Sequence, residues 1–454
     1  MRTSRILWIV GIVACWTALG VAADWRVGIA RTDITPTEPV WMAGYAARNH
    51  LPEGTLHPLW AKALVVEDQR GGRAVIVTTD LIGFERASAD VICARVEKQT
   101  GIPRQRVVLN SSHTHCGPEV ESVATIAYDL TPEQQAAISR YTRKLEDKVA
   151  SVVAEACKSL RPANLAFGEG KATFAINRRA RHDKGVAIGV NPEGPVDHAV
   201  PVLVVRDESG RLLGALFGYA CHNTTLSIYQ YNGDYAGFAQ IAFEKVHPGA
   251  TAMFMIGCGG DCNPHPRGKV ELAEEHGKSL AAAVDRTLAG QLHPVQGPLA
   301  VAFQRVDLPF VDPPGKEELQ KRVGQGNKYQ QRLTKVLLER LAQRGSLDTA
   351  YPCPVQVVRF GNDLSLIALA GEACIDYALR LRKECKNERI WIAGYSSEVF
   401  AYVPSERVLK EGGYEGGDAM VYFGWHGPFK PGVEDRVVGT VKTLMDQCRQ
   451  ANAR

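Results

Sequence analysis

A closely spaced pair of histidines, His113 and His115, is the strongest chemical signal in the sequence. The pair follows an apolar segment that we expect to form a strand at Arg106–Asn110. In extended backbone, side chains two residues apart lie on the same face, so both imidazoles would face one site. The pair could therefore supply one metal ligand and a neighbouring acid or base, with a hydrogen-bonded turn as the structural alternative.

Two other residues of metal-ligating type also follow apolar segments. His222 comes after the strand expected at Leu213–Tyr219, and Glu372 comes after the strand expected at Leu364–Ala370. Catalytic zinc sites commonly hold the ion with about three protein ligands of this kind and leave one position open. Taken alone, His222 could be a structural histidine, and Glu372 could instead stabilise the start of a helix.

The remaining candidates are polar residues next to glycine or proline. Asp261 and Asn263 lie in a glycine-rich turn, which could approach a ligand closely or simply connect a strand to a helix. Arg178 could bind a substrate oxygen or belong to a solvated arginine cluster. Tyr402 and Tyr414 flank a segment containing Pro404, and glycine pairs at 412–413 and 416–417 bracket Tyr414; the types of the two tyrosines alone do not single them out.

Short β-branched runs alternate with helical patterns, which is typical of an α/β sheet. The expected strands are Ala74–Thr78, Arg106–Asn110, Val202–Val205, Leu213–Tyr219, Ala252–Ile256, Val355–Phe360, Leu364–Ala370 and Arg389–Gly394. The expected helices are Ala87–Thr100, Pro132–Ser159, Gly237–Val246, Lys269–Leu288, Lys316–Gln343, Ala373–Glu384 and Glu434–Arg449. Since ligands of open α/β sheets collect beyond the carboxyl ends of strands, the polar residues after the strands should converge on one site.

The composition excludes several classes of protein. The 454 residues are 45% hydrophobic and 22% charged, as in an ordinary globular protein. With 53 basic and 49 acidic residues the net charge is +4, which gives no general electrostatic basis for binding nucleic acid or an anionic membrane. The chain also lacks the GxSxG and HExxH motifs and any P-loop or dinucleotide-binding glycine pattern.

The first 23 residues have the order of a secretory signal peptide. Arg2 and Arg5 precede an apolar run that ends at Val21-Ala22-Ala23, so we expect cleavage after Ala23 and export to the periplasm or medium. An uncleaved membrane anchor and a lipid anchor at Cys15 are the alternatives. The remaining ten cysteines show no compact disulfide spacing, so we expect mostly core residues with one or two bridges.

Taken together, these segments resemble the neutral/alkaline non-lysosomal ceramidase family, specifically its N-terminal catalytic domain. The resemblance rests on weak motifs that occur in the family's order: 28–36, 42–46, 113–115, 177–178, 222, 260–261, 371–372, 402 and 414. It implies one α/β catalytic domain at 24–454, with mixed sheets flanked by helices.

The resemblance also implies site roles. A zinc ion would be bound by four ligands, His113, His222, Glu372 and Tyr402. His115 and Tyr414 would transfer protons or stabilise an oxyanion, and the substrate would be bound by Arg178, Asp261 and Asn263. The implied reaction is hydrolysis of the N-acyl amide bond of a ceramide-like lipid to a fatty acid and a sphingoid base.

Two departures from the family bear on that expectation. Asn263 stands where the family has serine, so covalent serine catalysis at this position is excluded and a zinc-dependent route is not. Typical members also continue into a C-terminal β-sandwich domain, and we expect this chain to be a short member without one. A zinc amidase for another N-acylated lipid, sugar or peptide, and a ligand-binding relic without catalysis, are therefore the alternatives. In each case we expect a small-molecule partner, no nucleic acid and at most transient contact with a membrane surface.

Overall fold

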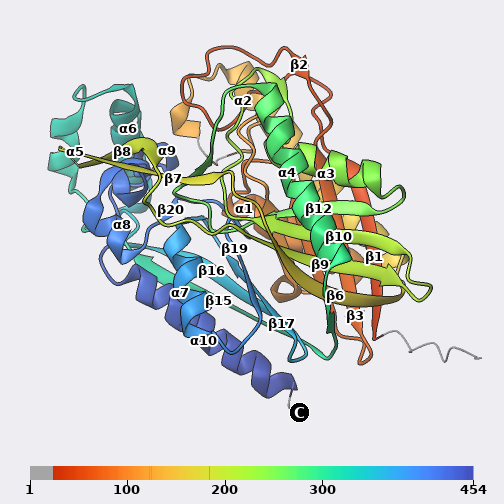
Figure 1. Ribbon diagram of the computed structural model, residues 1–454. Coiled ribbons are helices and arrows are strands. Elements are labelled where there is room, and N and C mark those ends of the chain that lie inside the picture. Colours follow the sequence, from red (N-terminus) through yellow and green to blue (C-terminus); the bar gives the residue numbers. More distant parts are fainter. Residues whose placement is uncertain (1–23, 122, 124, 184, 453–454) are drawn as a thin grey trace, which may run out of the picture.

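The protein is a mixed α/β structure built around two packed sheets (Figure 1). The computed structural model describes residues 24–121, 123, 125–183 and 185–452. The expected leader at 1–23 lies outside the described residues, so its cleavage stays a prediction. Among the described helices, none combines the length and the apolar character needed to cross a membrane.

The larger sheet has the strand order β12-β10-β9-β6-β1-β3-β4-β5, with β14 paired to β6. The β10–β12 and β4–β5 pairs are parallel and the other pairs are antiparallel, which makes the sheet mixed. Its strands are β1 (Trp25–Asp33), β3 (Trp60–Asp68), β4 (Arg73–Thr79), β5 (Val107–Ser111), β6 (Arg161–Lys171), β9 (Ala199–Asp207), β10 (Leu212–Tyr219), β12 (Thr251–Ile256) and β14 (His293–Val295).

The second sheet has the order β15-β16-β17-β19 and is antiparallel except for the β17–β19 pair. Its strands are β15 (Leu299–Pro309), β16 (Ala350–Phe360), β17 (Leu364–Leu369) and β19 (Ile390–Ala393). The shorter strands are β2 (Gly54–Thr55), β7 (Ala175–His182), β8 (Gly185–Asn191), β11 (Gln230–Tyr231), β13 (Cys262–Pro264), β18 (Glu372–Ala373) and β20 (Tyr402–Val403).

Helices cover the outer faces of both sheets. In Figure 1, α3 and α4 lie along the larger sheet, while α7 and α10 lie along the smaller one. The helices are α1 (Arg86–Thr100), α2 (Pro132–Lys158), α3 (Asp234–Val246), α4 (Val270–Ala289), α5 (Lys316–Arg322), α6 (Lys328–Arg344), α7 (Ile375–Glu384), α8 (Glu406–Glu411), α9 (Met420–Phe423) and α10 (Val433–Asn452). The short turns are the 3₁₀ helices η1 (Arg104–Arg106) and η2 (Thr125–Ala127) and the π-helical turn η3 (Tyr414–Asp418).

Alternation along the strands explains the layering. Within β3, Leu64 and Val66 pack between the two sheets, together with Leu366 of β17, whereas Ala63 and Val65 pack toward α1 and α2. Because both faces of the sheet are covered at β3 and β4, these two strands are nearly continuous buried runs. The molecule therefore has four layers: helices, larger sheet, smaller sheet, helices.

The two edge strands of the larger sheet, β5 and β12, come together at the site through one side chain. Asn110 in β5 accepts a hydrogen bond from the amide of Ile256 in β12 (3.1 Å) and donates one to the carbonyl of Gly394 (2.8 Å), directly after β19. The side chain is 1% exposed. Asn110 therefore joins both ends of the larger sheet to the smaller one.

The expected elements agree with the structure in most places. The helix expected at Pro132–Ser159 is confirmed as α2, which Thr131 caps in a capping box with Gln134. The single helix expected at Lys316–Gln343 is wrong: Gly324 and Gly326, with φ of +74° and +75°, separate α5 from α6. Arg178 lies within β7, a strand that is not among the expected ones.

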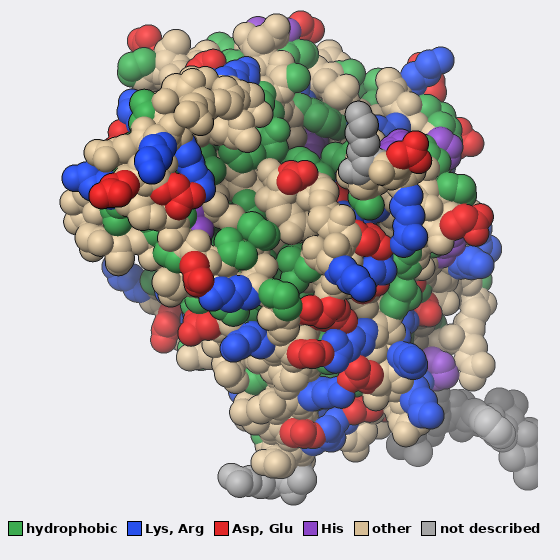
Figure 2. Space-filling view, turned by 90° about the vertical axis from the view of Figure 1, so that its left-hand side faces the viewer, with side chains coloured by type: hydrophobic (Ala, Val, Ile, Leu, Met, Phe, Trp, Pro, Cys, Tyr) green, Lys and Arg blue, Asp and Glu red, His purple; other side chains and the backbone are tan. Residues whose placement is uncertain are grey.

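Figure 2 shows basic and acidic side chains interspersed over the face in view, with hydrophobic ones gathered in its upper half.

All ten cysteines of the described residues are free, so the expected one or two bridges are absent among them. Eight of the ten are buried, which confirms that most are core residues.

Candidate functional site

Three chain segments that follow expected strands, with His113, His222 and Glu372, meet at one place, as the sequence pattern indicated, and Tyr402 joins them there. A bridge between Thr114 and Asn223 aligns the segment after β5 with the segment after β10, which brings His113 and His222 together. Strands β18 and β20 pair in parallel with Glu372 opposite Tyr402. The four expected metal ligands therefore come from four segments and lie side by side.

The local backbone of the histidine pair differs from the extended form expected. His113 has φ of +62°, in the left-handed region, so the chain turns there instead of continuing β5. The two rings are nevertheless close, with centroids 4.9 Å apart. The expectation of extended backbone was wrong, and the closeness of the imidazoles comes from a turn.

One carboxylate oxygen, Glu372 Oε2, is the meeting point of two imidazoles. It lies 3.2 Å from His113 Nε2 and 3.0 Å from His222 Nε2, and all three side chains are at most 4% exposed. Burial acts to raise the pKa of Glu372, but the two imidazoles outweigh it and hold that pKa well below its usual range. The Tyr402 hydroxyl lies 3.4 Å from the same His222 nitrogen.

The other ring nitrogens fix how these imidazoles are protonated. His113 Nδ1 lies 2.6 Å from the carbonyl of Ile82, and His222 Nδ1 lies 2.6 Å from that of Gly259. A carbonyl only accepts, so each Nδ1 is the ring's donor to that carbonyl, and each Nε2 is left to face the carboxylate oxygen. Metal-binding histidines commonly have this arrangement, with one ring nitrogen held by a carbonyl and the other directed at the metal position.

The third histidine, His115, has a different environment. Its ring centroid lies 4.9 Å from that of His113 and 5.8 Å from that of His222, and neither buried ring nitrogen has a hydrogen-bond partner among the described residues. Burial, aided by the other two imidazoles, holds the pKa of His115 well below its usual range. Ligand atoms of His113, His115 and His222 all lie within 4.8 Å of one another, so this group could hold a metal ion.

Arg178 is buried and ion-paired, which excludes the alternative of a solvated arginine cluster. Its Nη2 donates to the Tyr402 hydroxyl (2.9 Å), its Nη1 to Asn263 Oδ1 (3.2 Å) and its Nε to Glu415 (2.7 Å). Thr224 donates a second hydrogen bond to Asn263 Oδ1 (3.3 Å). One guanidinium therefore connects an expected metal ligand with the residue at the family's serine position.

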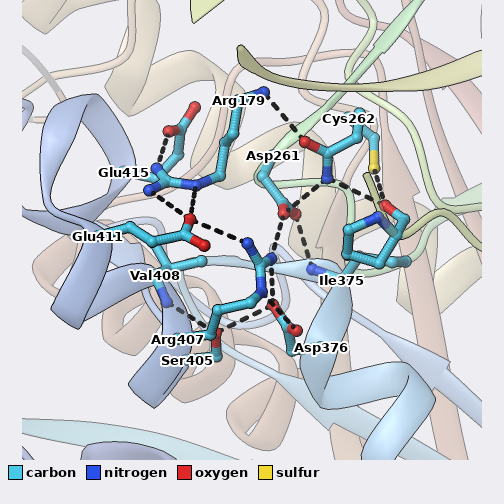
Figure 3. A network of polar contacts seen from close by, with 12 residues as sticks. Arg179, Asp261, Cys262, Ile375, Asp376, Ser405, Arg407, Val408, Glu411 and Glu415 are labelled. Atoms are coloured by element: carbon cyan, nitrogen blue, oxygen red, sulfur yellow. Dashed lines mark hydrogen bonds and ion pairs between the residues drawn. The ribbon is translucent and has the colours of Figure 1, made fainter. Parts of the chain in front are cut away.

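Asp261 lies in a neighbouring polar network and does not line the pocket described below (Figure 3). Its carboxylate accepts hydrogen bonds from the Ile375 amide (2.8 Å), from Asn177 (3.1 Å) and from Arg407 (3.4 Å), and the residue is 0% exposed. Burial raises the pKa of Asp261 to about 6, although the bond from Ile375 opposes this. These contacts connect α7, β7 and α8 behind the site.

An apolar pocket of about 270 Å³ opens onto His113, His115 and Glu372. Tyr414, the remaining predicted site residue, is part of its wall, and burial raises the pKa of the Tyr414 hydroxyl. The other lining residues are mostly aliphatic or aromatic: Tyr45, Ala46, Ala47, Ile82, Val123, Ala127, Tyr128, Ile188, Val399, Tyr402, Tyr422 and Phe423. The arrangement can bind an apolar group next to a polar centre.

Sequence reasoning missed three residues of the site. Tyr395 follows β19 and packs against His113 with ring centroids 4.5 Å apart, and Glu415 and Thr224 hold Arg178 and Asn263. The rule that polar residues follow strands applies to Tyr395 and would have found it. Glu415 had only a weak signal, the glycine pairs around it.

Comparisons with known proteins support the family indicated by the motifs. The family model described as neutral/alkaline non-lysosomal ceramidase, N-terminal, matches residues 25–299. Neutral ceramidase A of Dictyostelium discoideum is 26% identical over 272 residues, which are 54% of this chain and 37% of that protein. Neutral ceramidase of Pseudomonas aeruginosa is 28% identical over 256 residues, 53% of this chain and 37% of that protein. The matched region therefore spans 37% of the length of these relatives.

Solved structures share the fold over nearly the whole chain. A ceramidase complexed with C2 superposes with a TM-score of 0.73 at 20% identity, covering 94% of this chain and 76% of that one. The crystal structure of neutral ceramidase from Pseudomonas aeruginosa gives a TM-score of 0.72 at 22% identity, covering 95% and 75%. The mixed α/β architecture predicted from the sequence is thus confirmed.

Proposed function

Because the chain belongs to the neutral/alkaline non-lysosomal ceramidase family, we propose that it hydrolyses the N-acyl amide bond of ceramide-like lipids with the help of a zinc ion. The products are a fatty acid and a sphingoid base. The observation that carries the proposal is the convergence of His113 Nε2 and His222 Nε2 on Glu372 Oε2, at an apolar pocket. We further propose that residues 24–454 act as one catalytic unit that is exported.

The residues that would hold zinc are His113, His222, Glu372 and Tyr402. The carbonyls behind His113 and His222 support this choice over His115, whose ring nitrogens have no such orienting partner among the described residues. When bound, a zinc ion lowers the pKa of a bound water and polarises a carbonyl oxygen. The donor set of two imidazoles and a carboxylate suits that ion.

Proton transfer falls to His115 in this proposal. Its lowered pKa keeps the ring neutral, so a ring nitrogen can accept a proton from the attacking water. The same nitrogen can then return the proton to the leaving amine. Tyr414 keeps its hydroxyl hydrogen because burial raises its pKa, so it can donate a hydrogen bond to the oxyanion.

Substrate binding divides between the pocket and the polar side of the site. The aliphatic and aromatic lining excludes water and receives an acyl or alkyl chain. Arg178 and Asn263 present polar groups next to Tyr402, where a substrate hydroxyl or carbonyl would lie. Asp261 stays in the proposal as a residue that supports the site from behind, through its contacts with Asn177, Ile375 and Arg407.

The test combines elemental analysis of the purified protein with hydrolysis of a labelled ceramide and a panel of other N-acyl amides. We expect about one zinc per chain, lost together with activity in His113→Ala and His222→Ala. A metal-free protein that still hydrolyses amides would contradict the zinc mechanism. Activity confined to N-acylated sugars or peptides would contradict the ceramide-like substrate and support a zinc amidase for those compounds. Zinc binding without any turnover would identify a ligand-binding relic.

A further inference from the structure

Glu415 binds two consecutive arginines with its two carboxylate oxygens. Oε1 accepts a hydrogen bond from Arg178 Nε at 2.7 Å, and Oε2 accepts one from Arg179 Nη1 at 2.6 Å. The three side chains are at most 5% exposed. Charge-assisted bonds of this length in a buried setting are strong and strictly directional. The carboxylate therefore fixes the plane of the Arg178 guanidinium.

The other nitrogens of that guanidinium contact the proposed catalytic centre. Arg178 Nη2 donates to the Tyr402 hydroxyl and Nη1 donates to Asn263 Oδ1. Since the guanidinium is a rigid planar fork, fixing Nε also fixes where both Nη atoms point. Because arginine only donates, the Asn263 atom facing it must be the oxygen, so the amide nitrogen points elsewhere. Glu415 thus controls two groups that it does not touch.

The backbone of η3 is built to direct neighbouring side chains to different places. Gly412 and Gly413 precede this π-helical turn with φ of +67° and +73°, and Gly417 kinks it at φ of 166°. Tyr414 lines the pocket while Glu415, the next residue, reaches the arginines. Single π-helical turns occur frequently at functional sites. The turn therefore connects the pocket wall to the arginine pair.

We propose that Glu415 is a positioning residue that acts through Arg178 to orient the Tyr402 hydroxyl and the Asn263 amide. The inference rests on the proposed function, because it assigns Tyr402 to the metal and Asn263 to the substrate. Partners behind a metal ligand orient it, and their loss commonly reduces metal affinity or activity by about 10–100-fold. Glu415 lies one residue further back, behind Arg178, and is the group that holds this partner.

Glu411 provides a matched control. It accepts hydrogen bonds from Arg179, Arg181 and Arg407 in the same network, yet it has no contact with Arg178 among the described residues (Figure 3). Substitutions at Glu411 therefore test the general loss of a carboxylate from the network. The same substitutions at Glu415 test the position of Arg178 in addition.

The experiment compares Glu415→Gln and Glu415→Asp with Glu411→Gln and Glu411→Asp. Aspartate keeps the charge and withdraws the carboxylate by one methylene, so a role of charge alone would leave Glu415→Asp like the wild type. Zinc affinity is measured by chelator competition, and the ligand field is measured from the visible spectrum of the Co²⁺-substituted protein. Both readouts are independent of substrate; kcat and KM on a labelled ceramide are measured alongside.

We expect both Glu415 variants to lose about 10–100-fold in zinc affinity, with a changed cobalt spectrum and a lower kcat. Both Glu411 variants should stay within about twofold of the wild type. Folded Glu415 variants with wild-type zinc affinity and cobalt spectrum would overturn the inference, as would equal losses at Glu411. If Glu415→Gln does not fold, Glu415→Asp decides. A wild type that binds zinc but hydrolyses no amide would contradict the proposed function. The zinc affinity and the cobalt spectrum of the variants would still decide whether Glu415 is a positioning residue.

Discussion

The α-carbon of Gly44 lies directly against the imidazole of His115. A Cβ placed on Gly44 would lie 2.4 Å from His115 Cγ, and the residue has φ of +92°, which side chains rarely adopt. Tyr45, the next residue, packs edge-on against the same ring with centroids 4.9 Å apart. Gly44 and Tyr45 therefore pack against the ring of the proposed proton-transfer residue and hold it in place.

Gly44→Ala should displace His115 and reduce kcat at least about tenfold, because small displacements of catalytic groups slow reactions strongly. Gly101→Ala is the matched control, since Gly101 also has a positive φ (+73°) but nothing within 4 Å of the added methyl. Both variants should lose about 1–2 kcal/mol of stability from backbone strain. Steady-state kinetics measure the displacement of His115, and urea unfolding measures the backbone strain. Equal activity in the two variants would contradict a role of Gly44 in positioning His115.

His115→Gln distinguishes a proton-transfer residue from a third metal ligand. We expect the variant to keep about one zinc per chain and to lose about 10²–10⁴-fold in kcat, as for removal of a general base. Elemental analysis and kinetics on the same preparation provide both numbers. Loss of zinc would instead make His115 a ligand, together with His113 and His222.

Asp261 should make stability depend on pH. Its pKa in the folded protein is about 6, whereas an unperturbed aspartate titrates near 4. The raised value means that this group stabilises the fold below about pH 4, and that the contribution is lost as the pH rises through about 6. Between those limits the wild type should lose about 3 kcal/mol relative to Asp261→Asn in urea unfolding. Parallel stability profiles for the two proteins would contradict a buried, titrating Asp261.

The cysteines should be unreactive in the native state. Burial raises the thiol pKa of Cys93 and Cys448 to about 11 and that of Cys116 to about 12, which leaves little thiolate at neutral pH. Of the ten free cysteines in the described residues, only Cys157 and Cys385 are not fully buried. A thiol reagent should therefore modify at most about two sites in the native protein. Unfolding without reductant should make all ten thiols reactive, and fewer than ten reactive thiols would reveal disulfides.

The positions of the site residues were predictable where chemistry and strand pattern coincide. His113, His222 and Glu372 follow runs such as Leu213–Tyr219, whose apolar character depends only on burial in the sheet. The rule that ligands gather beyond the ends of strands then predicts their convergence. The capping box at Thr131 was equally accessible, because its hydrogen bonds are local.

Other features depend on contacts between distant segments. Glu415 acquires its role from β7, over two hundred residues earlier, and no local pattern indicates that pairing. The left-handed turn at His113 is stabilised by a bond from its ring to the Ile82 carbonyl, which only the folded chain provides. The N-terminal strand β1 was not recognised, because only part of it is buried and its apolar pattern is interrupted.

The link that Asn110 makes between β5, β12 and the segment after β19 joins parts of the chain that are synthesised far apart in time. The family model ends at residue 299, yet Glu372, Tyr402 and Glu415 come later in the chain. A nascent chain can therefore complete most of its larger sheet while its histidines still lack the carboxylate that they meet. The proposed hydrolysis therefore requires the last third of the chain to be synthesised and folded against the larger sheet.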